Sequence, residues 1–436
     1  MSRDITSWGR HPPLPPERTV VVRDRDARLP GHLPPALPFG NGRSYGDSCR
    51  NEGGTLLLTR DLDRFIAYDA ERGVLRCEAG VLFADILDRI VQDGWFLPVT
   101  PGTRFITVGG AIANDVHGKN HHVAGSFGRY VERFELLRSD GTRVLCSPDE
   151  SPELFAATIG GLGLTGLITW AQIRLTRVPG PWLSVETMRF GSLPEFFALS
   201  GESMAWEHAV AWIDCLAPVG QRGRGLFSRA RPIEHECKRG QTSRRRWRVP
   251  LTPPFPVLGG VGLRQFNRLW FHRPLKPIAI RHYAPFLYPL DGIGEWNRLY
   301  GPRGFVQHQC VIPPDAAERT VAALLDCIAD AGEGSFLAVL KTFGDLASPG
   351  MLSFPRPGTT LALEFPWRGE RTARLLARLE DKVVDAGGAV YPAKDAHMSA
   401  ASFRRFFPAW QAFSRCVDPG FSSSFWRRVH PEETRD

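Results

Sequence analysis

The chain has 436 residues, of which 43% are apolar and 23% are charged, a composition typical of a soluble protein with two domains. No stretch approaches the roughly 18 uninterrupted apolar residues that a membrane-spanning helix needs, and the first residues have no apolar signal-peptide core. We therefore expect a cytoplasmic protein that does not span a bilayer.

The net charge of +8 favours acidic partners such as nucleic acid, phosphorylated substrates or anionic lipid, without choosing among them. Only six of the 54 basic residues are lysines, so a lysine within a motif is informative. The eight cysteines are spread singly with no CxxC pair, which predicts neither a disulfide framework nor a zinc ribbon.

The first part of the chain predicts short strands and helices in mixed order. Alternating apolar runs predict strands, apolar residues at spacings of three and four predict helices, and the turn at residues 139–141 predicts a hairpin. The expected strands cover residues 19–22, 55–58, 65–68, 74–77, 130–137, 143–146 and 166–175, and the expected helices cover residues 82–91 and 151–159.

The pattern breaks at residues 179–181, Pro-Gly-Pro, which predicts a domain boundary. A long, irregular, proline-rich and basic stretch is expected over residues 228–277. Beyond it, strands alternate with helices, as in an α+β sheet domain. The expected strands are 305–312, 336–343 and 359–365, and the expected helices are 316–331 and 371–386.

Three glycine-rich motifs carry the chemistry. Residues 38–47 form a glycine-rich turn whose backbone N–H groups suit a pyrophosphate, although a tight surface turn has the same composition. Residues 107–122 place small side chains beside a polar, histidine-rich HGKNHH run. Residues 161–166 form a literal GxGxxG, but a helix precedes it and a strand follows it, the reverse of the dinucleotide fingerprint.

A zinc site is the alternative interpretation of the histidines at 117, 121 and 122. Gly118 argues against a rigid helix there, and no carboxylate or cysteine stands at a familiar spacing. We therefore predict no metal.

Together the three motifs resemble the vanillyl-alcohol-oxidase type of FAD-binding domain. The HGKNHH run and the later segments EWNR, GFVQ, SFP and YPAKD, which begin at residues 295, 304, 353 and 391, are similar to the decaprenylphosphoryl-β-D-ribose 2'-oxidase family. Members of that family are the flavin half of an epimerase that makes an arabinose donor. The resemblance implies a flavin domain over residues 1–178 and 390–436, and an α+β substrate domain with an antiparallel sheet over residues 179–389.

The resemblance also implies the residues that hold FAD. They are Pro38, Phe39, Gly40, Asn41, Gly42, Arg43, Ser44, Tyr45, Gly46, Asp47, Ser48, Gly102, Thr107, Val108, Gly109, Gly110, Asn114, Asp115, Val116, His117, Ile168 and Tyr391. Arg43 stands where sugar-oxidising relatives often carry a flavin-linking histidine, so non-covalent FAD is expected.

Alcohol oxidation requires a base for the hydroxyl proton and a cation near the developing oxyanion. His117 is the slightly preferred base and Lys394 the cation, although His117 also fits a packed flavin contact. The residues expected to meet substrate are Tyr45, Lys119, Trp212, Gln307, Gln309, Lys341, Thr360 and Lys394. Thr360 and Ala362 replace an asparagine and a cysteine of the mycobacterial enzyme, which leaves the exact sugar and lipid open.

The expected reaction is oxidation of the 2-hydroxyl of a polyprenyl-phosphoryl pentofuranose, the first half of its epimerisation. A nicotinamide-dependent keto-reductase partner, a quinone acceptor and peripheral contact of residues 244–258 with the inner face of a membrane are also expected. Two alternatives remain open, a flavin oxidase of a free sugar, alditol or aldonolactone, and a non-catalytic basic surface protein. No nucleic-acid-binding pattern accompanies the charge.

Overall fold

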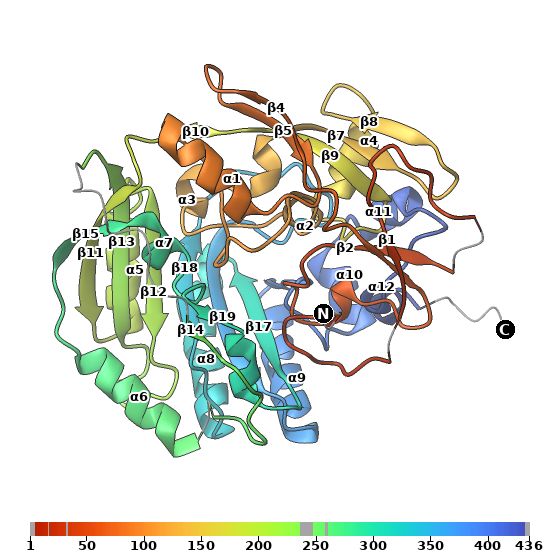
Figure 1. Ribbon diagram of the computed structural model, residues 1–436. Coiled ribbons are helices and arrows are strands. Elements are labelled where there is room, and N and C mark those ends of the chain that lie inside the picture. Colours follow the sequence, from red (N-terminus) through yellow and green to blue (C-terminus); the bar gives the residue numbers. More distant parts are fainter. Residues whose placement is uncertain (1–4, 16, 32–33, 236–246, 258–259, 432–436) are drawn as a thin grey trace.

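A computed structural model describes residues 5–15, 17–31, 34–235, 247–257 and 260–431 (Figure 1). One part of the chain carries the glycine-rich motifs on two smaller sheets, and the other part is built on one broad antiparallel sheet. This mixture of helices and mainly antiparallel sheets confirms the predicted α+β class.

The first part holds a three-stranded parallel sheet, β1–β3–β2, and a five-stranded antiparallel sheet, β4–β5–β9–β7–β8. All of the strands expected in this part are present within one or two residues. The strands are β1 (Arg18–Val21), β2 (Ala36–Phe39), β3 (Thr55–Leu58), β4 (Phe65–Asp69), β5 (Val74–Glu78), β7 (Val131–Leu137), β8 (Arg143–Cys146) and β9 (Leu167–Arg174); a further pair is β6 (Trp95–Phe96) with β10 (Thr176–Arg177).

Four short helices link these strands: α1 (Phe83–Ile90), α2 (Val108–Ala113), α3 (His121–Ala124) and α4 (Pro152–Thr158). Helix α1 buries Phe83, Ile86, Leu87 and Ile90, the apolar stripe that predicted it. The GxGxxG at residues 161–166 lies between α4 and β9, so its reversed order is confirmed and it is not a dinucleotide fingerprint.

The second part is an eight-stranded antiparallel sheet in the order β15–β11–β13–β12–β18–β19–β17–β20. Helices α5 (Leu193–Glu202), α8 (Ala317–Asp330) and α9 (Glu370–Asp385) pack on one face, and the other face looks toward the first part (Figure 1). The strands are β11 (Trp182–Phe190), β12 (His208–Ile213), β13 (Gly225–Ile233), β15 (Ile278–His282), β17 (Phe305–Ile312), β18 (Ala338–Phe343), β19 (Gly358–Pro366) and β20 (Ala389–Val390).

The expectation of an irregular stretch over residues 228–277 is wrong in part. Strand β13 runs into this stretch as far as Ile233, and helix α6 spans Gly260–His272. Leu263, Asn267 and Phe271 of α6 are buried at helical spacing, but the surrounding prolines and arginines mask that period in the sequence. Residues 236–246, with part of the expected membrane-contact segment, lie outside the described residues.

Short elements follow α6: β14 (Trp247–Arg248) pairs with β16 (Ile293–Gly294), and α7 covers Tyr283–Leu287. No helix within the described ranges has the length and apolarity to span a bilayer.

The C-terminal segment returns to the first part. After β20, which pairs with β17 in the broad sheet, helices α10 (Ala400–Phe406), α11 (Trp410–Cys416) and α12 (Ser424–Val429) follow. Phe421 forms a parallel bridge to Ala36 at β2, and Arg428 of α12 forms ion pairs with Asp47 and Asp395. The expected domain boundary at residue 390 therefore falls inside a strand of the broad sheet.

Candidate active site

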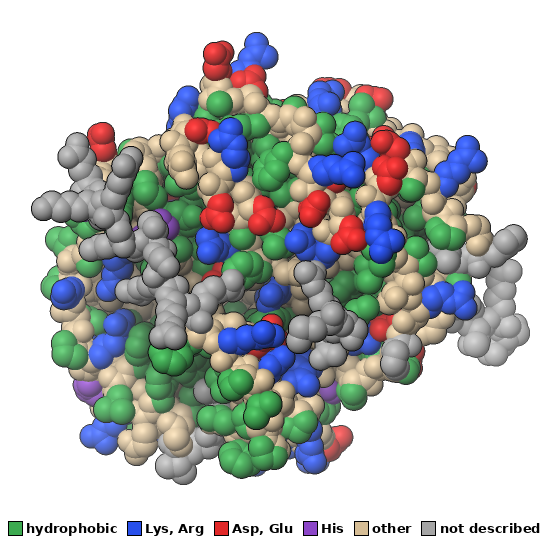
Figure 2. All heavy atoms as spheres, viewed as in Figure 1, with side chains coloured by type: hydrophobic (Ala, Val, Ile, Leu, Met, Phe, Trp, Pro, Cys, Tyr) green, Lys and Arg blue, Asp and Glu red, His purple; other side chains and the backbone are tan. Residues whose placement is uncertain are grey.

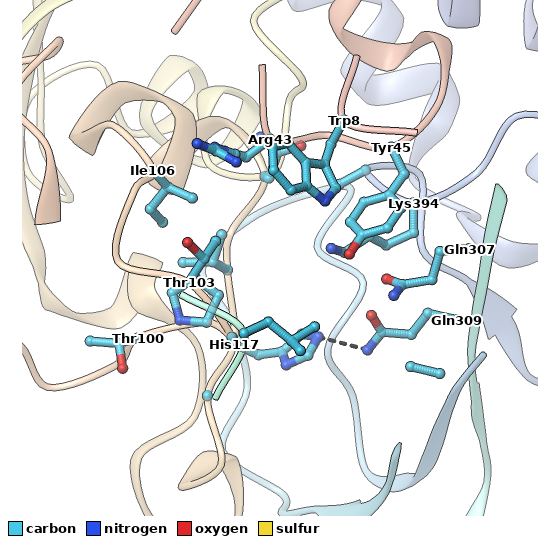
Figure 3. A pocket seen from close by; sticks show the side chains of 18 of the residues that line it. Trp8, Arg43, Tyr45, Thr100, Thr103, Ile106, His117, Gln307, Gln309 and Lys394 are labelled. Atoms are coloured by element: carbon cyan, nitrogen blue, oxygen red, sulfur yellow. Dashed lines mark hydrogen bonds between the residues drawn. The ribbon is translucent and has the colours of Figure 1, made fainter. Parts of the chain in front are cut away.

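A cavity of about 730 Å³ lies between the glycine-rich motifs and the open face of the broad sheet. Its walls include the loop after β2, the start of α2 and side chains of β12, β17, β18 and β19. Figure 3 shows Trp8, Tyr45, His117, Gln309 and Lys394 arranged around the open space.

The glycine-rich loop fits an anionic cofactor. The backbone N–H groups of Asn41, Gly42 and Ser44 donate no hydrogen bond to any part of the chain that the structure describes. Gly42 has a φ of 60°, the left-handed conformation that glycine adopts without strain. The Ser48 hydroxyl faces the same cavity and is buried without a partner among the described residues, so these groups are available to hold a ligand.

The second motif forms the opposite wall. Gly109, Gly110 and Ala113 of α2 line the cavity and leave room for a flat ring system, with Ile168 and Tyr391 nearby in the lining. The Thr107 hydroxyl caps α2 by accepting the Gly110 N–H at 3.1 Å. Most of the residues that the resemblance assigned to FAD therefore surround one cavity.

Five of those assigned residues do not line the cavity: Phe39, Gly46, Asp47, Val108 and Asp115. Asp47 accepts hydrogen bonds from Arg428, at 2.7 and 2.9 Å. Gly46 packs so tightly that a Cβ atom there would lie 1.7 Å from the Asp395 carbonyl oxygen. These two residues shape the loop and connect it to the segment that carries Lys394.

Asp115 is buried and its carboxylate accepts hydrogen bonds from the Ser348 and Ser353 hydroxyls and the Gly128 N–H. Burial raises the pKa of this carboxyl group. Its contacts hold the turn before His117 against the segment between β18 and β19.

His117 is held at both ring nitrogens. Nδ1 lies 2.9 Å from Lys341 Nζ, and Nε2 lies 2.9 Å from Gln309 Nε2. Burial, the largest cause, lowers the pKa of His117 well below its usual value, which favours the neutral ring. A neutral imidazole has one N–H and one acceptor nitrogen, so its two partners cannot both donate.

A neutral amine at Lys341 would resolve this conflict, because its nitrogen can accept from Nδ1–H. It is buried, and no carboxylate in the described part of the chain acts on it. Burial, followed by the charges of Lys119 and Lys394, lowers the pKa of Lys341 well below its usual value. Nδ1–H then donates to Nζ, Nζ donates to the Gly118 carbonyl at 3.0 Å, and Gln309 donates to Nε2. In this arrangement the Nε2 lone pair of His117 faces the Gln309 amide at the cavity wall.

Lys394 and Tyr45 form the neighbouring wall, with Lys394 Nζ 3.9 Å from the centre of the Tyr45 ring. Burial lowers the pKa of Lys394 to about 8, while the Glu364 charge acts in the opposite direction. Lys394 therefore remains mainly an ammonium ion at neutral pH.

Glu364 of β19 lies behind this wall and was not predicted. Its carboxylate accepts hydrogen bonds from the hydroxyls of Tyr45, at 3.0 Å, and Tyr300, at 2.9 Å, and from the Gln307 amide, at 2.9 Å. Burial raises the pKa of Glu364 to about 7. A lone carboxylate in the apolar strand 359–365 was a sequence signal that could have indicated it.

The other substrate candidates also line the cavity. Lys119 Nζ donates to the Leu287 carbonyl at 2.8 Å, and burial lowers the pKa of Lys119 to about 8. Thr360 accepts from the Gln309 amide at 3.2 Å, and Trp212 forms part of the sheet face. Trp8, Phe266 and Trp270 line the cavity as well and carried no recognised motif.

Comparisons with known proteins agree with this geometry. The FAD binding domain family matches residues 32–147. The chain is 33% identical to decaprenylphosphoryl-β-D-ribose oxidase of Mycolicibacterium smegmatis, over 98% of this chain and 97% of that protein. It is 34% identical to an uncharacterized protein of Streptomyces coelicolor, over 79% of this chain and 98% of that protein. Human Δ(24)-sterol reductase shares 32% identity over 25% of this chain and 21% of its own length.

The cavity and these relatives identify an FAD-dependent oxidoreductase, as the glycine-rich motifs predicted. Because a relative above 30% identity spans nearly the whole chain, the protein belongs to the decaprenylphosphoryl-β-D-ribose oxidase family.

Proposed function

We propose that the protein oxidises the 2-hydroxyl of a ribofuranosyl group carried on a polyprenyl phosphate to the 2-keto sugar, with non-covalent FAD as the oxidant. The observation that carries the proposal is a cavity with two chemical zones. His117, Gln309, Lys341 and Lys394 make one end polar and cationic. Beyond Trp212 the lining becomes mainly apolar, which suits the lipid attached to the sugar.

FAD, when bound, supplies the acceptor for the hydride that leaves C2 of the sugar. The His117 Nε2 lone pair accepts the hydroxyl proton after the substrate hydroxyl displaces the Gln309 amide, and Nδ1–H remains donated to Lys341. The Lys394 ammonium group stabilises negative charge on the C2 oxygen or on the adjacent phosphate. In total, the CH–OH group at C2 loses one hydride from carbon and one proton from oxygen.

Two partners complete the proposed chemistry. A nicotinamide-dependent keto-reductase would reduce the 2-keto product to the arabinose epimer, and a quinone would reoxidise the flavin. The reductase is supported because a 2-keto sugar must be reduced again to complete an epimerisation, and the acceptor because a reduced flavin must be reoxidised before the next turnover.

The proposal is tested by product analysis. Purified protein, incubated with polyprenyl-phosphoryl ribose and an electron acceptor, should give a product that has lost two hydrogen atoms and that borodeuteride labels at C2. Acid precipitation should release FAD into the supernatant, because Arg43 cannot form the flavin bond of a histidine. Oxidation of free ribose, an alditol or an aldonolactone at a comparable rate would instead support a free-sugar oxidase.

A further inference from the structure

One end of the cavity reaches the surface at α6 and β15. Trp270, Arg273 and Arg281 line the cavity and also reach solvent, because Trp270 is 38% exposed, Arg273 is half-buried and Arg281 is exposed. β15 is four strands from β18, whose Lys341 contacts His117. At the usual spacing this is about 19 Å, so the opening is remote from the reacting end.

The sheet face between these points is mainly apolar. In antiparallel pairs, directly opposed residues share a face, and the register pairs Gln309 with Ala362, Ala362 with Val339, Val339 with Trp212 and Trp212 with Leu226. Phe266 of α6 also lines this extension. An apolar path therefore leads from the sugar end of the cavity to Leu226 of β13. From there to the opening the lining includes Val185 and the hydrogen-bonded pair Thr187 and Ser228.

The chain segment that carries the opening has one sign of charge. Residues 247–290 contain six lysines and arginines and no aspartate or glutamate, although the whole chain has 46 acidic residues in 436. Arg189 and Arg281 lie close enough to Arg273 to lower its pKa, after burial as the larger cause, and Arg273 Nε is buried without a hydrogen-bond partner among the described residues. The nearest acidic residue along the chain is Asp291, which accepts the Arg104 N–H.

The same region concentrates exposed apolar side chains. Nine of the fourteen large apolar residues that are exposed in the described part of the chain lie between residues 247 and 293. On α6, Leu269 is 73% exposed beside Arg264 and Arg268, while Leu263 and Phe271 are buried on the inner face. Figure 2 shows hydrophobic and basic side chains mixed over the part of the surface where Figure 1 places α6 and β15.

We infer that this mouth surface, formed by the exposed side chains of residues 262–281, docks on an anionic phospholipid bilayer and so delivers the lipid-linked sugar to the cavity. Basic residues next to exposed Leu and Trp are the pattern of a helix that lies in a membrane interface. A polyprenyl tail then stays in the bilayer while its sugar follows the apolar path to His117. The role in substrate delivery rests on the proposed function, but the docking itself does not.

The test is flotation of the FAD-loaded full chain with vesicles of phosphatidylcholine, alone or with about 30% phosphatidylglycerol. The protein should float with the anionic vesicles, and the bound fraction should fall when salt is raised. The double variant Arg264→Glu/Arg268→Glu should bind about 25-fold more weakly or worse, since each basic residue near the surface contributes roughly a factor of five. Leu269→Ser should weaken binding separately.

Matched controls lie elsewhere on the molecule. Arg319 of α8 and Arg374 of α9 are exposed on the opposite side of the broad sheet, so Arg319→Glu/Arg374→Glu makes the same charge change there. Val219, 84% exposed, supplies the apolar control as Val219→Ser. Each variant should keep its flavin spectrum and melting temperature.

Absence of flotation, equal binding to neutral vesicles, or equal losses in the control variants would overturn the docking surface. Flavin reduction by a short-chain prenyl-phosphoryl ribose, measured without vesicles, separates the two proposals. Flavin reduction without vesicle binding would support the proposed function and contradict the docking surface. Vesicle binding without flavin reduction would support the docking surface and contradict the proposed function.

Discussion

At the scale of single residues, the buried carboxylate of Glu364 controls the charge beside the proposed reaction. It accepts hydrogen bonds from Tyr45, Tyr300 and Gln307, and its charge supports the ammonium form of Lys394. Lys394 carries its charge below a pKa of about 8 and loses it above that pH. The rate of flavin reduction should therefore fall as the pH rises through about 8.

Glu364→Gln should move this fall to lower pH. Without the carboxylate, burial lowers the pKa of Lys394 unopposed, so the cation is lost earlier. Stopped-flow measurement of flavin reduction from pH 6 to pH 10 checks the shift. Tyr300→Phe should shift the profile less, because it removes one hydrogen bond to Glu364 but leaves the carboxylate and the cavity lining in place. An unchanged profile in Glu364→Gln would show that Glu364 does not act on Lys394.

The protonation state of Lys341 can be tested by replacement. Lys341→Arg introduces a permanent donor, which would force the His117 hydrogen onto Nε2 and remove the proposed base. Lys341→Met removes the hydrogen-bond partner of His117 Nδ1, so either ring nitrogen of His117 can carry the hydrogen. Flavin reduction should fall at least about 100-fold in Lys341→Arg and by less in Lys341→Met, with FAD still bound. Equal losses in the two variants would contradict the neutral amine.

At the scale of elements, α12 connects the glycine-rich loop to the segment that carries Lys394. Arg428 donates to Asp47 and to Asp395, and both carboxylates are nearly buried. Arg428→Ala leaves two acidic groups facing each other without a cation. We expect a loss of about 3 kcal/mol in the free energy of unfolding, and faster loss of FAD.

Chemical denaturation and flavin release on dilution measure these two effects. Arg405→Ala, on the exposed side of α10, is the control and should change neither quantity. Unaltered stability in Arg428→Ala would show that the ion pairs do not hold the loop.

At the scale of the whole molecule, the sequence predicted local structure better than long-range contacts. Alternation and helical spacing predicted β3, β17 and α1 to within a residue or two, because those periods are local. The needs of alcohol oxidation indicated His117 and Lys394, and the scarcity of lysines indicated Lys341; the structure brings all three to one cavity. Helix α6 was missed because its buried face depends on packing against Asp214 and Phe336, far away in the chain. The Glu364 contacts were missed for the same reason, since Tyr45 is 319 residues away.

The central claim, that this cavity oxidises a lipid-linked pentose, is tested most directly by anaerobic bleaching of the bound flavin. After anaerobic mixing, polyprenyl-phosphoryl ribose should bleach the visible absorbance of the flavin. Free ribose or an alditol should not. Lys394→Ala, with FAD bound, should lose the response to the lipid-linked sugar. Bleaching by the free sugars to the same extent, or no bleaching by the lipid-linked sugar, would contradict the account.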